Sequence, residues 1–275
     1  TIAVLSATDG TVSIAPSASF SVADLAQNTT TTAGGSDRSV TVDTTAPTVT
    51  VNQAAAQADP TNAKSITYTV VFSETVTGVT AAKFTVGGTA TGFTATSVTG
   101  SGATYSVVVS GTTVGQGTVT LSLAAASVTD PAGNGNVAST STDATVTYDS
   151  VAPTITLQQG FTQSDPTTSS TIAFRLLSTE PLDLATVTSG DFTLTNATFG
   201  SFDTTDPASI RILVTASAQG VVSIAPSGTF SVADVAGNAT SATVAGSDRS
   251  VLFDSVAPTL TLQQGIYQLD PTTDS

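Results

Sequence analysis

The chain has 275 residues, 39% of them hydrophobic, which is enough for about two domains with cores of their own. Its 20 acidic and 6 basic residues give a formal net charge of −14, a balance that repels nucleic acid and anionic lipid and attracts cations. The absence of cysteine excludes disulfides and thiolate metal sites and fits an exported bacterial protein, and no apolar run approaches the roughly 20 residues of a membrane span. We therefore expect no nucleic-acid partner and no membrane insertion in this segment.

The sequence repeats with a period of one whole small domain. The motif Asp-x-x-Ala-Pro-Thr occurs three times, and its prolines at 47, 153 and 258 are 106 and 105 residues apart. This period is far longer than a solenoid repeat and is typical of an array of domains. Because proline fixes its own φ and biases the preceding residue towards extended geometry, each copy of the motif predicts a short, stiff joint.

The repeat also predicts the domain boundaries. Residues 10–28 match residues 220–238 at 14 of 19 positions, so the chain is expected to enter a domain midway and to be cut from a longer array. The expected units are the C-terminal part of a domain at 1–43, complete domains at 44–149 and 150–254, and the N-terminal start of a further domain at 255–275.

Within each unit, apolar residues alternate with polar ones. In residues 65–72, Ile66, Tyr68, Val70 and Phe72 fall on one side of an extended chain, as in a strand that covers a core with one face. The same alternation occurs at Tyr105, Val107 and Val109; Val119, Leu121 and Leu123; Ile172, Phe174 and Leu176; and Ile210, Ile212 and Val214. About seven such strands per period predict an all-β fold of tandem immunoglobulin-like β-sandwich domains, joined end to end by the Asp-x-x-Ala-Pro linkers.

Strand order then assigns the loops to the two ends of a domain. Because neighbouring strands run in opposite directions, Glu74 and Asp130 are expected at the end that faces the preceding domain, and Asp59 and Asp149 at the other end. The strands used for this map are 65–73, 103–109, 117–123 and 142–148, lettered B, E, F and G.

Most of the acidic residues recur at the repeat period. The recurring sets are Asp24, Asp130 and Asp234; Asp37, Asp143 and Asp248; Asp43, Asp149 and Asp254; Asp59, Asp165 and Asp270; and Glu74 and Glu180. On the map, one group converges on the first complete joint and another on the second. The first consists of Asp43, Glu74 and Asp130, and the second of Asp149, Glu180, Asp234 and Asp59; Asp165 and Asp254 take the matching places at the joint that follows.

Two explanations of these acids remain open. Carboxylates about 4 to 6 Å apart repel one another by a few kcal/mol per pair, and no Lys or Arg recurs beside them. A divalent cation would offset the repulsion, and a set of oxygen ligands suits Ca²⁺ and disfavours Zn²⁺. Alternatively, the aspartates are turn residues that accept hydrogen bonds from the backbone two residues on, and the set containing Asp143 is expected to have only capping or strand-start roles.

Three motifs together resemble a known family. Phe72–Gly78 (FSETVTG), Asp130–Asn134 (DPAGN) and the Asp-x-x-Ala-Pro-Thr joints resemble the bacterial Ig-like repeats of large surface adhesins and biofilm-associated proteins. This resemblance implies a rigid extracellular stalk, often with Ca²⁺ at its joints. The joint motif is also similar to the calcium-binding linker of cadherins, which implies that Asp43, Asp149 and Asp254 are ligands. The second domain departs from the pattern, since Glu180 is followed by Pro-Leu-Asp without a glycine.

The functional prediction is therefore a structural one. Without His or Cys, and without a Gly-x-Ser-x-Gly elbow, the chain lacks the commonest general base and nucleophiles and is not expected to be an enzyme. We expect a Ca²⁺-stiffened stalk of an extracellular adhesin or biofilm protein, whose partners are the neighbouring repeats of the same chain. The alternative is a subunit segment of an S-layer, sheath or surface filament that contacts other copies. A third class, a domain that binds glycan or protein through its loops, predicts an unusual aromatic stretch, and residues 199–206 are mildly atypical.

Overall fold

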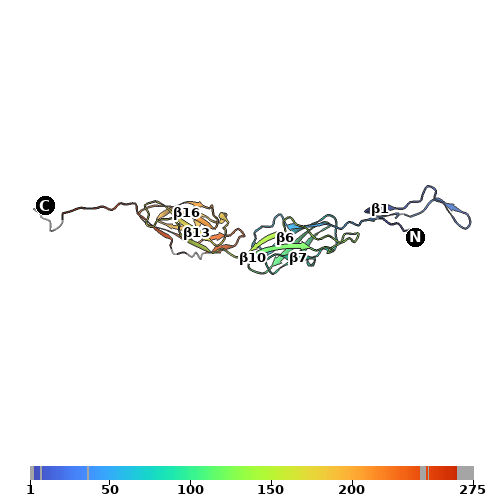
Figure 1. Ribbon diagram of the computed structural model, residues 1–275, viewed down its shortest axis with the longest axis horizontal. Helices are drawn as coiled ribbons and strands as arrows, with labels where there is room; N and C mark the ends of the chain where they lie inside the picture. Colours follow the sequence, from blue (N-terminus) through green and yellow to red (C-terminus); the bar gives the residue numbers. More distant parts are fainter. Residues whose placement is uncertain (1–2, 7, 36, 242–245, 247, 265–275) are drawn as a thin grey trace. The chain divides into compact units, whose positions relative to one another are not determined.

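A computed structural model of the chain describes residues 3–6, 8–35, 37–241, 246 and 248–264 (Figure 1). It divides into two compact units, residues 1–151 and 152–275, and each is described here by itself. The regular elements are β-strands and three short 3-10 turns, which confirms the predicted all-β class. The turns are η1 (Ala81–Lys83), η2 (Leu184–Thr186) and η3 (Ser189–Asp191). None of the described residues belongs to a helix long and apolar enough to cross a membrane.

The first unit begins with two small antiparallel ladders. Strand β1 (Gly10–Ser13) pairs with β4 (Ser39–Val42), and β2 (Val22–Ala23) pairs with β3 (Thr29–Thr30). The apolar side chains of Ile14, Val22 and Val40 are exposed there. Their counterparts in the second unit are buried under a second sheet, so residues 3–43 have the strands of half a sandwich.

The rest of the first unit is a complete two-sheet sandwich. One sheet has the strand order β5-β6-β9-β8 and the other β11-β10-β7, with antiparallel pairing throughout. The strands are β5 (Val49–Gln53), β6 (Ser65–Phe72), β7 (Phe84–Gly87), β8 (Phe93–Ser101), β9 (Thr104–Gly111), β10 (Gln116–Leu123) and β11 (Thr145–Asp149). Of the four strands with predicted bounds, β6, β9 and β10 lie within a residue or two of their predicted positions, and β11 begins three residues later than predicted. That strand begins at Thr145 because Thr140 and Asp143 hydrogen bond to β5 instead of to β10.

The predicted alternation is the inner face of this sandwich. Ile66, Tyr68 and Val70 on β6 are 0% exposed and pack against the facing sheet. The hydroxyl of Tyr68 donates a hydrogen bond of 2.8 Å to the carbonyl oxygen of Val119 on that sheet. Burial, together with the negative charge of Asp59, raises the pKa of the Tyr68 hydroxyl well above its usual value.

The second unit repeats the same sheet order. Its larger sheets are β12-β13-β16-β15 and β14-β17-β20, and a small ladder joins β18 and β19. The strands are β12 (Ile155–Gln159), β13 (Thr171–Ser178), β14 (Phe192–Thr195), β15 (Ala197–Asp203), β16 (Ser209–Ala216), β17 (Gly220–Pro226), β18 (Ser231–Ala233), β19 (Ala239–Ser241) and β20 (Ser250–Phe253). Phe174 and Ile212, both 0% exposed, lie at the centre of its core. The sheet order makes β12, β13, β15 and β16 the counterparts of β5, β6, β8 and β9.

Candidate metal centre

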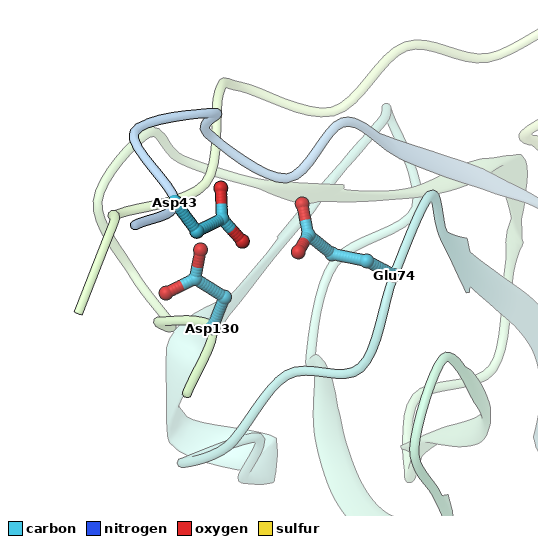
Figure 2. Close-up of side chains that lie close together, drawn as sticks. All are labelled: Asp43, Glu74 and Asp130. Carbon is cyan, nitrogen blue, oxygen red and sulfur yellow. The ribbon is translucent and has the colours of Figure 1, made fainter. Parts of the chain in front are cut away.

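The structure brings Asp43, Glu74 and Asp130 together in the first unit. One carboxylate oxygen from each of the three lies within 4.8 Å of the others, and Figure 2 shows the three carboxylates facing one another. Asp43 follows β4 directly, Glu74 lies two residues after β6, and Asp130 lies in the loop between β10 and β11. The antiparallel order of the strands thus places all three at one end of the sandwich.

The loop that holds Asp130 is built around its carboxylate. Oδ1 accepts hydrogen bonds from the backbone N–H groups of Gly133 (2.6 Å) and Asn134 (2.8 Å), and Oδ2 accepts one from Nδ2 of Asn134 (2.8 Å). Gly133 has φ +98°, a conformation that favours glycine. The side chain is only 2% exposed, and burial acts to raise its pKa. The hydrogen bonds from Asn134, Gly133 and Ala132 outweigh burial, so the pKa of Asp130 lies below its ordinary value.

Asp43 also has a turn role, but with one oxygen only. Its Oδ1 accepts a hydrogen bond of 3.0 Å from the backbone N–H of Thr45. The same turn recurs at the other joints, where Asp149 accepts from Val151 (2.9 Å) and Asp254 from Val256 (3.0 Å). In Asp43, Oδ2 accepts no hydrogen bond from any described residue. Turn formation and metal binding are therefore compatible at this position, because they use different oxygens.

Glu74 has no such local explanation. It is partly buried, and no described residue donates a hydrogen bond to its carboxylate or pairs with it as a cation. Desolvation raises its pKa, and the negative charges of Asp43, Asp130 and Asp9 raise it further. The raised pKa means that the ionised carboxylate is disfavoured in this position, and turn chemistry gives Glu74 no role.

Asp9 is a fourth acid that the sequence pattern missed. Its Oδ1 accepts hydrogen bonds from the backbone N–H (2.7 Å) and the hydroxyl (2.6 Å) of Thr44, and its Oδ2 accepts one from the Thr45 hydroxyl. These hydrogen bonds, led by that of the Thr44 hydroxyl, lower the pKa of Asp9. In the matched segments at 10–28 and 220–238, the residue before the shared Gly is Asp9 or Gln219. Oε1 of Gln219 accepts a hydrogen bond of 2.9 Å from the backbone N–H of Ser255. The role that Asp9 and Gln219 share is therefore to accept a hydrogen bond from the backbone of the joint, which needs no negative charge.

Asp59 and Asp165 have a different role. Oδ1 of Asp59 accepts a hydrogen bond of 2.9 Å from the backbone N–H of Thr147, and Oδ1 of Asp165 accepts one of 2.8 Å from that of Leu252. Each carboxylate thus ties the loop after the first strand of its domain to the last strand. Within the described part of the chain, neither belongs to a group of three or more acids close enough to share an ion.

The remaining predicted residues repeat these local environments. Asp234 is 1% exposed and accepts hydrogen bonds from the backbone N–H groups of Ala236 (2.8 Å) and Asn238 (2.9 Å) and from Nδ2 of Asn238 (2.9 Å). Glu180 follows β13 by two residues, as Glu74 follows β6, and is likewise partly buried. Asp149 ends β11 and belongs to the first unit, where its Oδ2 accepts a hydrogen bond of 3.0 Å from Nε2 of Gln116.

A comparison with protein families supports the fold of the first sandwich. A family model described as Bacterial Ig-like domain matches residues 43–147. Among solved structures, InvD of Yersinia pseudotuberculosis is similar at 19% sequence identity and a TM-score of 0.33, over 82% of this chain and 62% of that one. The chain thus spans about 62% of the length of the InvD chain, and no curated protein matches it. Bacterial Ig-like domains are commonly extracellular and typically non-enzymatic. Residues 43–147 belong to the bacterial Ig-like domain family.

Proposed function

We propose that the chain is a structural repeat region of an extracellular bacterial adhesin or biofilm protein, in which Ca²⁺ stiffens the joints between Ig-like domains. Three features support this proposal. Residues 43–147 match the bacterial Ig-like domain family, the second unit has the same sheet order, and a carboxylate cluster lies beside the first complete joint. In such a protein the repeats hold a binding module away from the cell and take no part in catalysis.

The observation that carries the calcium part of the proposal is Glu74. Asp43 and Asp130 are fixed by hydrogen bonds, each to a different stretch of backbone, and Glu74 faces them without a counter-charge. A divalent cation would remove the repulsion that raises the pKa of Glu74. Carboxylate oxygens from three separate chain segments are ligands that Ca²⁺ prefers, and its flexible coordination tolerates their irregular arrangement.

An ion in this position would act on the joint itself. Asp43 precedes the Ala-Pro joint, whereas Glu74 and Asp130 belong to the domain that follows it. A cation bound to all three would tie the end of one repeat to the loops of the next and restrict bending there. By sequence register, Asp149, Glu180 and Asp234 are the equivalent set at the next joint, and Asp254 begins the set after that.

Calcium titration of the full chain by isothermal calorimetry tests the proposal. We expect binding at two sites, and a Ca²⁺ concentration of about 100 times Kd should raise the free energy of unfolding by about 2.7 kcal/mol. The variant Glu74→Gln keeps the shape of the side chain but removes its charge, and it should remove one of the two sites. Glu74→Gln combined with Glu180→Gln should remove both.

The matched control is Asp59→Asn, which removes a recurring acid that lies outside the cluster and should leave the calcium stoichiometry unchanged. Small-angle scattering with Ca²⁺ and then with a chelator measures the mechanical consequence. A chain that binds no Ca²⁺ at millimolar concentration, or whose scattering is indifferent to chelation, would refute the calcium-stiffened joint.

A further inference from the structure

The outer face of one sheet in the second unit carries two arginines in direct opposition. Arg175 on β13 and Arg211 on β16 are cross-strand partners, and they lie between inward-facing residues of the core. The whole chain has only six basic residues against 20 acidic ones, so two adjacent guanidinium groups are an exceptional local concentration of positive charge. Like charges directly opposite each other on a sheet destabilise it.

Nearby side chains hold Arg175 in place without forming an ion pair with it. Arg175 donates to the carbonyl oxygen of Ser209 (3.2 Å) and to its hydroxyl, and its guanidinium carbon lies 4.9 Å from the ring centroid of Phe161. That ring is 66% exposed. Across the sheet from Arg211 lies Asp203, but no described acid forms an ion pair with either arginine.

The carboxylate of Asp203 lies within the electrostatic influence of the arginines but accepts its hydrogen bonds from Thr205. Its Oδ1 accepts hydrogen bonds from the hydroxyl (2.6 Å) and the backbone N–H (3.2 Å) of Thr205. These hydrogen bonds lower the pKa of Asp203, and the positive charges of Arg211 and Arg175 lower it further. Among the described residues, Arg175 donates side-chain hydrogen bonds to Ser209 alone and Arg211 donates none, so both keep donor groups available for an anion from outside the chain.

The first unit shows that the fold does not require these residues. By the repeat and the strand pairing, the counterpart of Arg175 is Thr69 and that of Arg211 is Ser106, which face each other across β6 and β9. The counterpart of Phe161 is Ala55, and that of Asp203 is Thr99. The same sheet is thus built with small neutral residues in one domain and with a cationic, aromatic set in the other.

We propose that the arginine face, defined by Phe161, Arg175 and Arg211, binds the carboxylate of an acidic glycan. Guanidinium groups recognise a carboxylate with paired, charge-assisted hydrogen bonds, and two of them side by side favour a carboxylate over a neutral hydroxyl. The exposed ring of Phe161 offers an apolar surface to the C–H groups of a sugar. The amide of Gln158, opposite Arg175 on β12, lies on the same face as a further hydrogen-bonding group.

Other polymers fit this face less well. A stable protein interface needs about 1,000 Å² or more with an apolar centre, whereas the other large apolar side chains of the face are Leu177 and Leu213, both only partly exposed. The net charge of −14 opposes nucleic acid, whose phosphates form a dense row of charge. A short acidic oligosaccharide carries far fewer charges than a nucleic-acid duplex and experiences less of this repulsion.

Titration of the full chain with a short oligogalacturonate tests the proposal, with calorimetry and amide chemical shifts as readouts. We expect binding that weakens with added salt, disappears with the methyl-esterified oligosaccharide, and shifts amides of β13, β16 and residue 161. Arg175→Thr with Arg211→Ser installs the residues of the first unit, so it should fold, and it should weaken binding at least about tenfold. Lys64→Ser with Lys83→Ser removes the same charge elsewhere and should leave binding unchanged.

The reciprocal transfer sharpens the test. Ala55→Phe with Thr69→Arg and Ser106→Arg should give the first unit a second oligogalacturonate site. No binding to wild type, equal binding after Arg175→Thr with Arg211→Ser, or equal binding of the methyl ester would overturn the proposal. Tighter binding of polyglutamate than of oligogalacturonate would overturn it in favour of an acidic peptide. Glu74→Gln with Glu180→Gln should leave this binding intact, so the result is independent of the calcium joint.

Discussion

The two complete sandwiches of the chain, built from β5 to β11 and from β12 to β20, have the same sheet order but fill their cores differently. In the first, Tyr68, Tyr105 and Tyr148 donate hydrogen bonds to the carbonyl oxygens of Val119, Val76 and Thr113. Their counterparts in the second are Phe174, Ile210 and Phe253, which have no hydroxyl group. In the first core, tyrosine hydroxyl groups thus form hydrogen bonds with loops and with the opposite sheet. At the equivalent positions the second core has apolar packing alone.

On the outer faces of the sheets it is the second domain that has the more polar side chains. The first domain presents Thr69 and Ser106 where the second presents Arg175 and Arg211. Inner positions must fill a closed space and therefore remain large and apolar in both domains, even where a hydroxyl is gained or lost. Outer positions face water, so their chemistry can change without changing the fold. This contrast indicates that the outer faces of the sheets can differ between repeats in charge and hydrogen-bonding groups while the fold stays the same.

The largest expected effect is the loss of a central core ring. Phe174→Ala should destabilise the second domain by about 3 to 5 kcal/mol, because the deletion removes buried area and leaves a cavity. Because the chain has no tryptophan, circular dichroism is a suitable signal for chemical denaturation. It should show that the second domain unfolds at a lower denaturant concentration while the first domain keeps its midpoint. A simultaneous loss of both transitions would show that the two domains do not unfold independently.

Removing the carboxylate of Asp234, which accepts the hydrogen bonds of the loop between β18 and β19, should have the next largest effect. Asp234→Ala leaves the backbone N–H groups of Ala236 and Asn238 without their acceptor, and we expect a cost of about 2 to 3 kcal/mol without calcium. Asp130→Ala should do the same in the first domain. Differential scanning calorimetry in chelator measures both changes. Equal melting temperatures for wild type and variants would show that these hydrogen bonds do not hold the loops.

Much of this arrangement could be predicted from the sequence for simple reasons. The alternation in residues 65–72 depends only on the two-residue period of a strand, and the core confirms it. The placement of Glu74 and Asp130 at one end followed from strand direction, and the structure has both beside Asp43. Asp9 was missed because it does not recur as an acid at the repeat period. The arginine pair was missed because β13 and β16 are far apart in the sequence, and their pairing register is not revealed by composition.

The place of Asp59 in the expected group at the second joint stays a prediction. Strand direction places Asp59 and Asp149 at the same end of the first domain, but it does not say which way each carboxylate points. The backbone N–H of Thr147 holds the carboxylate of Asp59. An aspartate beside a strand end often bonds to the nearest free N–H group, and the sequence alone does not distinguish that outcome from metal binding.

Exchanging the buried hydroxyl group between the two cores should have a smaller effect on stability. Tyr68→Phe leaves the buried carbonyl oxygen of Val119 without its donor, and we expect a loss of about 1 to 2 kcal/mol in the first domain. Phe174→Tyr, the reciprocal change, adds a hydroxyl to a core that was packed without one and should also destabilise, by about 1 to 3 kcal/mol. Urea denaturation of both variants compares the two cores directly. A gain in stability for Phe174→Tyr would mean that the second core already offers an acceptor.

The smallest expected effect is a difference in pH dependence at the cluster of Asp43, Glu74 and Asp130. Because the pKa of Glu74 is raised above its ordinary value of 4.5 in the folded chain, the folded state holds a proton more tightly than the unfolded state does. In chelator, acidification through the range just above 4.5 should therefore stabilise the first domain slightly, and Glu74→Gln should abolish that gain.

Asp9 and Asp130 act in the opposite direction, since their pKa values lie below 3.8, and the stability they contribute is lost only as the pH falls below that value. Thermal melts at closely spaced pH values separate the two pH ranges. If the first domain only lost stability between neutral pH and 4.5, that result would contradict the unpaired state of Glu74. With calcium present the sign reverses, because the ion competes with the proton for Glu74, so acidification through the same range should weaken calcium binding.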